Sequence, residues 1–116
     1  MFQEPTPATA ANITQGTVVL RVTGRLDAIT SPEFEKTCLE SITSECRRMV
    51  LDFEGVEYVS SIGLRAILMV GKKIQAGKGE LGLSALRHNV KKTMEIACFC
   101  ALFPVYESTE AALRPR

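Results

Sequence analysis

The chain has 116 residues and a formal net charge of +1, from 14 lysine and arginine residues and 13 aspartate and glutamate residues. A hydrophobic fraction of 46% with 23% charged residues is typical of a globular domain and excludes a disordered or fibrous chain. A near-neutral chain offers no electrostatic footprint for nucleic acid, and no apolar run approaches the roughly 20 residues that span a bilayer. We therefore expect one soluble, cytoplasmic domain over residues 1–116, without a secretion signal, membrane insertion or nucleic-acid partner.

The N-terminal part of the chain predicts two strands. Residues 1–7 are small, polar or proline and are expected to be a disordered tail. Residues 8–14 are a weak candidate for an edge strand, followed by a turn at residues 15–16. Residues 17–23 are β-branched and largely apolar, which predicts a strand, and residues 24–27 are expected to break it.

The first helix is predicted to begin at Ser31 and to run to about Cys46. Ser31 can cap this helix and Pro32 suits its first helical position. The next strand is predicted at residues 49–53, a short apolar run typical of a strand buried on both faces, with a turn at Gly55. The apolar stripe of the helix consists of Phe34, Cys38, Leu39 and Ile42.

The second helix is predicted to begin at residues 60–61 and to end at about Ala76, before a glycine-rich turn. It is apolar over most of its girth, so it is expected to be well buried, with Ile67 in the core. Residues 80–84 predict a further strand, and Asn89 can cap a third helix.

The C-terminal part completes an alternating pattern. Residues 102–106 predict a short strand that Pro104 confines to the sheet edge, and residues 108–110 begin a last short helix. The predicted order is β-β-α-β-α-β-α-β-α. Strands that alternate with helices indicate an α/β fold with a mostly parallel central sheet.

The four cysteines and the single histidine do not suggest a metal centre. Cys38, Cys46, Cys98 and Cys100 lack Cys-x-x-Cys spacing, and His88 lies just before a predicted helix. We expect no metal and no cofactor, with reduced thiols that pack as small core hydrophobes. Strand-like alternation would expose one of the thiols of Cys98 and Cys100.

The sequence contains no recognisable catalytic constellation. A Gly-x-Ser-x-Gly elbow, a Walker loop and a dinucleotide fingerprint are all missing. Residues 77–79 fit a helix C-terminus, and the neighbouring carboxylates Asp52, Glu54 and Glu57 are interpreted as surface charge. The chain is therefore not predicted to be an enzyme.

One segment, residues 51–65, carries the functional signal. A buried strand leads through a short loop to Ser60 and Ser61 at a helix N-terminus. One interpretation is structural, with Ser60 as an N-cap that Ser61 merely follows. The other is phosphorylation, because a phosphate at a helix N-terminus meets free N–H groups and the positive end of the helix dipole.

Residues 52–65 read Asp-Phe-Glu-Gly-Val-Glu-Tyr-Val-Ser-Ser-Ile-Gly-Leu-Arg. This pattern resembles the signature of the STAS domain and, more narrowly, of the small bacterial anti-sigma factor antagonists. The sequence Gly-Arg-Leu-Asp at residues 24–27 also resembles the first loop of that family. The resemblance extends from about residue 17 to residue 112 and implies a single STAS-like domain.

The resemblance implies a switch between protein partners. In this family the unmodified antagonist binds an anti-sigma factor that is also a serine kinase, which frees the sigma factor. The kinase then phosphorylates the serine that opens the helix, the complex dissociates, and a metal-dependent serine phosphatase restores the active form. The commonest family loop reads Asp-Ser-Ser-Gly with its first serine as acceptor. Alignment on Gly63 places Ser61 at the acceptor, Ser60 at the aspartate and Ile62 at the second serine, with Ser60 as the alternative acceptor.

The resemblance also implies a partner-binding surface around Ser61 on a monomeric domain. Asp27 either caps its own loop or contacts the partner. Arg65, one helical turn beyond Ser61, either contacts the partner, pairs with the phosphate or is solvated. Gly63 either lets a partner backbone approach or permits close helix packing. The expected partner-binding residues are Gly24, Asp27, Ser60, Ile62, Gly63, Arg65 and Met69.

A second function stays open at the level of sequence. A STAS module can also serve as a non-phosphorylated scaffold or as an accessory subunit of a lipid or anion transporter. Phosphorylation of Ser61 by a cognate kinase distinguishes the switch from the scaffold.

Overall fold

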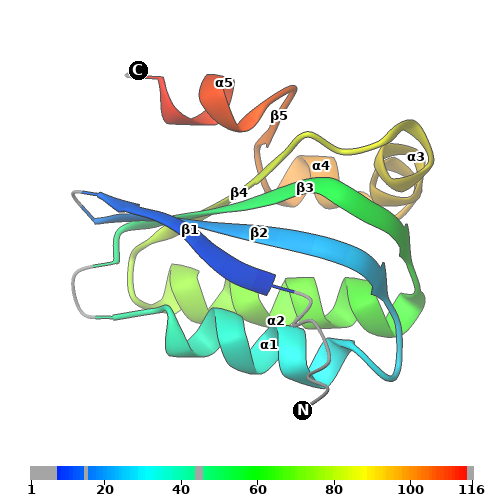
Figure 1. The fold of residues 1–116 in the computed structure, drawn as a ribbon, viewed down its shortest axis with the longest axis horizontal. Coiled ribbons are helices and arrows are strands. Elements are labelled where there is room, and N and C mark those ends of the chain that lie inside the picture. Colours follow the sequence, from blue (N-terminus) through cyan, green and yellow to red (C-terminus); the bar gives the residue numbers. More distant parts are fainter. Residues whose placement is uncertain (1–7, 15, 44–45, 115–116) are drawn as a thin grey trace, which may run out of the picture.

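The computed structural model describes residues 8–14, 16–43 and 46–114. These residues form a five-stranded sheet with helices packed against it (Figure 1). β1 runs antiparallel to β2, whereas β2, β3, β4 and β5 pair in parallel. This topology confirms the predicted α/β class with a mostly parallel sheet. The expected tail at residues 1–7 lies outside the described residues. In their order across the sheet, the strands are β1 (Ala8–Thr14), β2 (Thr17–Leu26), β3 (Arg48–Val59), β4 (Glu80–Ser84) and β5 (Val105–Tyr106).

The helices cover the two faces of the sheet unequally. α1 and α2 lie side by side against one face, and α5 lies over the opposite face (Figure 1). The main core lies between the sheet and the first four helices, and Ile67 of α2 is fully buried in it, as expected. No helix in the described part of the chain is long and apolar enough to cross a membrane. The helices are α1 (Ser31–Glu40), α2 (Ser61–Ala76), α3 (His88–Ile96), α4 (Phe99–Leu102) and α5 (Thr109–Leu113).

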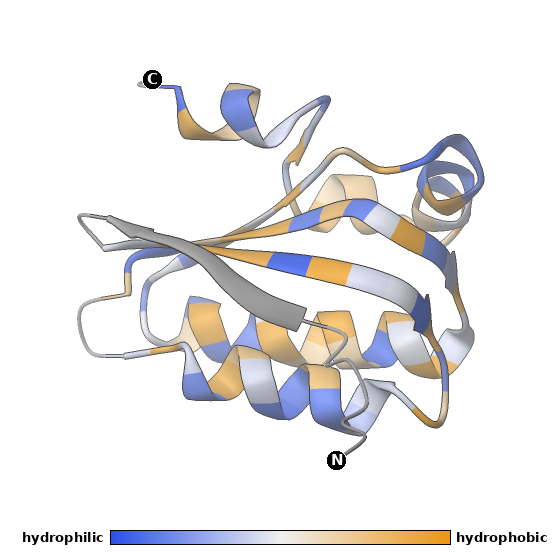
Figure 2. Ribbon diagram, in the orientation of Figure 1, coloured by the Kyte–Doolittle hydropathy of each residue, from blue (hydrophilic) through white to orange (hydrophobic). Residues whose placement is uncertain are grey.

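Alternation along the central strands gives the sheet one apolar face and one mixed face. Leu20 and Val22 of β2 point into the main core. Val19 instead packs with Val50 of β3 and Ala112 of α5 in a small second cluster. Beyond this cluster, hydrophilic residues alternate with hydrophobic ones along the middle of β2 and β3 (Figure 2). Among the described side chains of the second face, the apolar cluster lies beneath α5.

Strands β2 and β3 are longer than predicted. The break expected at Gly24 and the turn expected at Gly55 are both wrong, because these glycines lie inside strands where the β2–β3 pairing shifts its register. Gly24 has φ +83°, a conformation that favours glycine, and a Cβ on Gly55 would lie 2.8 Å from Thr23 Cγ2. Each glycine therefore marks an irregularity within the ladder, and the strands continue to Leu26 and Val59.

The first helix differs from its prediction at both ends. It ends at Glu40 rather than near Cys46, and Ser31 is its first helical residue rather than its cap. Thr30 occupies the N-cap position without a side-chain capping bond. The physical reason at the N-terminal end is the Asp27 loop, since the backbone carbonyl of Asp27 accepts the N–H of Ser31 at 2.9 Å and its carboxylate accepts the N–H of Thr30.

The third helix is capped differently from the prediction. Arg87 takes the N-cap position, and Asn89 already lies inside the helix. The side-chain amide of Asn89 donates instead to the backbone carbonyl of Glu57, at 2.8 Å. This contact ties the start of α3 to the end of β3, a long-range use of the amide that a local capping rule does not foresee.

The segment after α3 contains a helix that the sequence did not predict. Cys98 has φ +63° and is followed by the one-turn helix α4. Phe99 is buried there and packs edge-to-face on Phe103, with ring centroids 5.9 Å apart. The strand predicted at residues 102–106 is consequently reduced to β5, which lies at the sheet edge as expected from Pro104.

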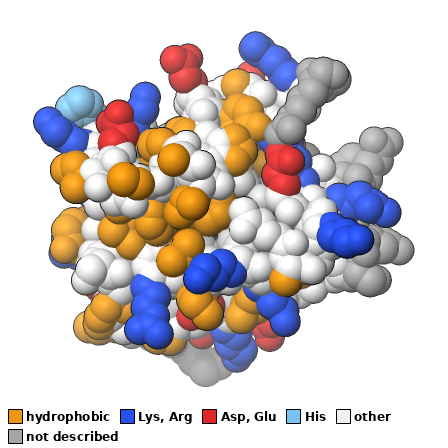
Figure 3. Space-filling view, turned by 180° about the vertical axis from the view of Figure 1, so that it is seen from behind, with side chains coloured by type: hydrophobic (Ala, Val, Ile, Leu, Met, Phe, Trp, Pro, Cys, Tyr) orange, Lys and Arg blue, Asp and Glu red, His pale blue; other side chains and the backbone are white. Residues whose placement is uncertain are grey.

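The cysteines divide into two kinds. Cys38 is buried in the core, as expected, and burial raises the pKa of its thiol to about 12. Cys46 is half-buried. The core prediction is wrong for Cys98 and Cys100, which are both exposed, one at the N-cap of α4 and the other within this helix, whose buried residue is Phe99. Hydrophobic side chains gather on the face seen in Figure 3, near the histidine of α3. Two exposed apolar side chains lie at the ends of α3 and α4, namely Ile96 and Leu102.

Candidate functional site

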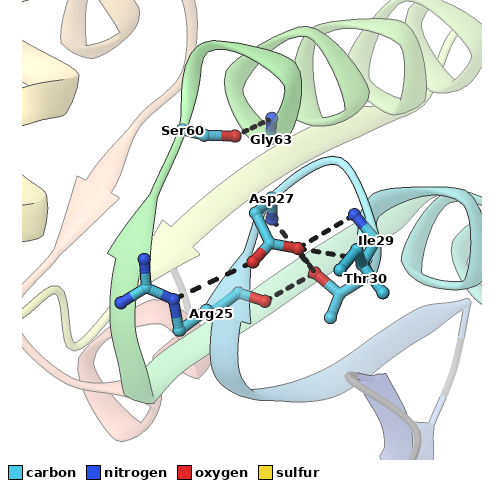
Figure 4. Close-up of polar contacts among 6 residues, drawn as sticks. All are labelled: Arg25, Asp27, Ile29, Thr30, Ser60 and Gly63. Atoms are coloured by element: carbon cyan, nitrogen blue, oxygen red, sulfur yellow. Dashed lines mark hydrogen bonds and ion pairs between the residues drawn. The ribbon is translucent and has the colours of Figure 1, made fainter.

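The segment predicted to carry function lies where β2 and β3 end. Leu26 and Val59 are register partners at the carboxyl ends of these parallel strands. The backbone N–H of Ser60 donates to the carbonyl of Leu26, at 2.8 Å. The loop after β2 and the first turn of α2 are therefore held next to each other, as Figure 4 shows.

Ser60 is the N-cap of α2. Its backbone is extended, with φ −84° and ψ 175°, and its Oγ accepts a hydrogen bond from the backbone N–H of Gly63, at 3.1 Å (Figure 4). Its carbonyl accepts the first helical bond, from Leu64 N–H at 2.9 Å. The half-buried side chain thus satisfies one of the free N–H groups at the helix start.

Ser61 is the first residue of α2 and is exposed to solvent. Within the described part of the chain, no hydrogen bond engages its hydroxyl. Arg65 and Met69 follow at helical spacing on the same face and are exposed as well. Ile62 is 49% exposed at the edge of this face. The helix therefore presents a free hydroxyl among accessible apolar and basic side chains.

Gly63 brings α2 into close contact with the end of β2. A Cβ at this position would lie 2.6 Å from the backbone oxygen of Leu26 and 3.0 Å from Cγ1 of Val59. The residue is buried. Of the two roles considered for Gly63, the structure displays the close packing of the helix.

Asp27 organises the loop between β2 and α1. Its Oδ1 accepts the backbone N–H of Ile29 at 3.0 Å and that of Thr30 at 3.1 Å (Figure 4). The hydroxyl of Thr30 completes the loop, because it accepts from Asp27 N–H and donates to the carbonyl of Arg25. The capping role considered for Asp27 is therefore present in the structure.

Two exposed side chains beside this site were not predicted. Tyr58 of β3 lies under the guanidinium of Arg25, 4.4 Å from the ring centroid, and Arg25 also pairs with Asp27 at 3.8 Å. Tyr58 is 41% exposed and Ile29, in the Asp27 loop, is 87% exposed. The sequence could have indicated that Ile29 is exposed, because it is a large apolar residue in a loop that is otherwise polar. For Tyr58, the alternation of buried and exposed side chains along a strand could have indicated an exposed position.

The structure brings Asp27, Ser60 and Gly63 together, whereas Met69 lies about two turns further along α2 and Gly24 lies apart. Ser60 donates its backbone N–H to Leu26, the residue that precedes Asp27, and Gly63 packs against Leu26 as well. Gly24 is instead a half-buried strand residue further back along β2, at the register shift. Its part is to shape the strand that leads to the loop.

Asp27 gives the loop a dependence on pH. The hydrogen bond from the backbone N–H of Thr30 is the largest cause that lowers the pKa of Asp27, and the N–H of Ile29 lowers it further. A carboxylate whose pKa is lower in the folded state stabilises the fold above its unfolded pKa of about 3.9 and loses this contribution as the pH falls. We expect the Asp27→Asn variant to show a smaller drop in melting temperature than the wild type between about pH 5 and pH 2. Parallel curves for the two proteins would contradict this assignment, and Glu95→Gln on α3 is the matched control for loss of an exposed carboxylate.

Comparison with known proteins decides the family. Residues 8–112 match the model of the STAS domain. The chain belongs to the STAS domain family. BtrV of Bordetella bronchiseptica, provisionally named an anti-sigma factor antagonist, is 34% identical to this STAS domain over 97 residues, which cover 84% of each chain.

Solved structures share the fold of this STAS domain. An anti-sigma factor antagonist from Mycobacterium paratuberculosis superposes with a TM-score of 0.80 at 23% identity, over 97% of this chain and 96% of that chain. The Bacillus cell fate determinant SpoIIAA in its phosphorylated form gives a TM-score of 0.71 at 19% identity, over 91% and 96% of the two chains. The resemblance to anti-sigma factor antagonists is thereby confirmed. That family consists of non-enzymatic regulators, which also confirms the prediction that the chain is not an enzyme.

Proposed function

We propose that this STAS domain is an anti-sigma factor antagonist that phosphorylation of Ser61 switches off. The unmodified form binds an anti-sigma factor with serine kinase activity and frees a sigma factor. A phosphate on Ser61 ends this binding, and a serine phosphatase restores it. The observation that carries the proposal is the exposed, unengaged hydroxyl of Ser61 at the first position of α2.

The surroundings of Ser61 suit a protein partner. Ile29 and Ile62 are large apolar side chains in solvent on neighbouring elements, and Met69 is 44% exposed on the same helix face as Ser61. Exposed apolar groups gathered at one place are typical of protein interfaces. We call this set the switch surface, and it consists of Asp27, Ile29, Tyr58, Ser61, Ile62, Arg65 and Met69.

Phosphorylation would change the switch surface without opposing the fold. The kinase transfers the γ-phosphoryl group of ATP to Ser61 Oγ, so that an O–P bond forms, the bond to ADP breaks and the hydroxyl proton passes to a base of the kinase. The phosphate then lies at the positive end of the α2 dipole, beside free N–H groups. It adds nearly two negative charges to the surface, and a partner shaped for a neutral hydroxyl is thereby repelled. Arg65, one turn further on, offers a cation to the same phosphate.

The two serines differ in availability. Ser60 is half-buried, and its Oγ is engaged with Gly63 N–H as the helix cap. Ser61 is exposed and has no capping role. A kinase that reached Ser60 would have to break the cap, which is worth about 1 kcal/mol. Ser61 is therefore the proposed acceptor.

The test is phosphorylation by the cognate anti-sigma factor kinase with ATP, read by intact mass and by fragment ions that locate the phosphate. We expect one phosphate on Ser61 in the wild type and none in Ser61→Ala. Ser60→Asn is the matched control, because asparagine is also a good N-cap but lacks a hydroxyl. We expect Ser60→Asn to be phosphorylated as the wild type is. Loss of phosphorylation in Ser60→Asn with retention in Ser61→Ala would assign the acceptor to Ser60, and no phosphate on any of the three proteins would contradict the proposed switch.

A further inference from the structure

The charge of the chain is unevenly distributed along the sequence. Residues 61–106, which include α2, β4, α3, α4 and β5, contain seven lysine and arginine residues but only two glutamates and no aspartate, a net charge of +5. The rest of the chain is therefore net acidic, since the whole chain carries +1. α1 shows the contrast, with three glutamates and a single lysine. The near-neutral total thus conceals a basic part of the molecule.

An uncharged segment lies within this basic part. Residues 96–106 contain no charged side chain, yet six of the eleven are exposed to solvent. Ile96 at the end of α3 is 78% exposed, and Leu102 at the end of α4 is 52% exposed. Scattered apolar residues on a surface need no explanation, whereas a contiguous apolar stretch marks an interaction site. The exposed residues of the segment are Ile96, Cys98, Cys100, Ala101, Leu102 and Pro104.

Lysines border this exposed segment. Lys92 precedes Ile96 by four residues on α3, so the two side chains lie on the same helix face. The end of α4 lies close to the middle of α2, because Gly71 lies directly against the ring of Phe103, and Lys72 follows Gly71 as an exposed residue. Figure 3 shows hydrophobic side chains gathered near the histidine of α3, with lysine and arginine side chains around them. We call the following set the α3–α4 surface: Lys72, Lys92, Ile96, Cys98, Cys100 and Leu102.

The composition of this surface favours a lipid bilayer over a protein partner. Lysine is depleted at protein interfaces, where arginine and aromatic residues are enriched. Surfaces that lie on membranes combine basic residues with large apolar side chains that enter the boundary between head groups and acyl chains. Five of the seven basic residues between positions 61 and 106 are lysines, and the large exposed apolar residues of the uncharged segment are Ile96 and Leu102. The α3–α4 surface therefore has the composition of a surface that contacts a membrane.

We propose that the α3–α4 surface binds the surface of an anionic lipid bilayer. The ammonium groups of Lys72 and Lys92 lie among the lipid phosphates, and their carbon stems lie along apolar surface. Ile96 and Leu102 enter the head-group region. The contact is peripheral and needs no membrane-spanning segment. It goes beyond the proposed function, because Ser61 takes no part in it.

The test is co-sedimentation of the full chain with vesicles of equal parts phosphatidylglycerol and phosphatidylcholine, and with vesicles of phosphatidylcholine alone. We expect the wild type to partition onto the anionic vesicles and to be released as the salt concentration rises, because salt screens the attraction to the lipids. Lys92→Gln is expected to lower the partition coefficient about fivefold, the usual contribution of one lysine near an anionic surface. Ile96→Ser is expected to lower it several-fold, because a buried apolar side chain is lost.

Lys36→Gln and Leu39→Ser are the matched controls, because both side chains are exposed on α1, whose other charges are acidic. Both variants should partition as the wild type does. Ser61→Ala should do so as well, which separates this result from the switch. Thermal unfolding of each variant checks its fold, and Lys92→Gln decides if Ile96→Ser does not fold.

Three results would overturn the proposal. The first is no partition of the wild type onto the anionic vesicles, and weaker binding of the anti-sigma factor by Ile96→Ser would then assign the surface to a protein. The second is equal partition onto the two kinds of vesicle, which would show that the lysines do not contribute. The third is an equal loss in Lys36→Gln and Lys92→Gln, which would indicate a diffuse effect of total charge.

Discussion

Replacement of Ser61 by aspartate is expected to weaken binding to the kinase-type anti-sigma factor by about 2–5 kcal/mol, the usual consequence of an unpaired charge buried in an interface. The fold itself should tolerate the change, because a negative charge at the first position of α2 lies at the positive end of the helix dipole. Ser61→Ala removes only a hydroxyl that makes no hydrogen bond with the described residues. It should bind within about 0.5 kcal/mol of the wild type, as surface substitutions usually do.

Partner affinity and thermal unfolding of wild type, Ser61→Ala and Ser61→Asp should be measured together. Equal affinities for all three proteins would contradict the switch. A loss of affinity in Ser61→Asp that is accompanied by a lower melting temperature would point to a damaged fold instead. Aspartate carries one charge where phosphate carries nearly two, so the phosphorylated protein is expected to bind more weakly still.

Gly63→Ala is expected to lower the free energy of unfolding by about 1–3 kcal/mol, the typical cost of overpacking. The new Cβ would lie 2.6 Å from the backbone oxygen of Leu26, and this oxygen cannot move away cheaply because it lies at the end of β2 and accepts the N–H of Ser60. The first turn of α2 would have to shift outward and would carry Ser61 with it. We therefore expect weaker partner binding in this variant as well.

Gly77→Ala is the matched control for chemical denaturation of Gly63→Ala. Gly77 lies at the other end of α2 with a negative φ of −90°, and the nearest atom to a Cβ there would be 3.6 Å away. It should change stability little. A Gly63→Ala protein as stable as the wild type would show that α2 can slide on β2 without cost, contrary to the packing described above.

Signals confined to neighbouring residues were sufficient for much of the fold. β-Branched runs predicted β2, Ser60 was considered as an N-cap of α2, and residues 108–110 predicted the start of α5. In the structure Ser60 and Ser108 both cap their helices by accepting a backbone N–H. These features rest on interactions within about four residues, so the local sequence contains all the participants. The motifs at residues 24–27 and 52–65 indicated the family, and the family match over residues 8–112 confirms it.

The roles of residues whose contacts lie far along the chain became clear only from the tertiary structure. Gly24 and Gly55 look like strand breaks locally, yet pairing between β2 and β3 carries both strands past them to the site. Likewise, the reason for a glycine at position 63 is the backbone of Leu26, an atom that no local pattern around α2 contains. Nor could the sequence show that Asp52, interpreted as surface charge, is buried at a cavity whose rim comes from α5. Burial and shape at these positions are set by contacts between distant segments, which exist only after the sheet has assembled.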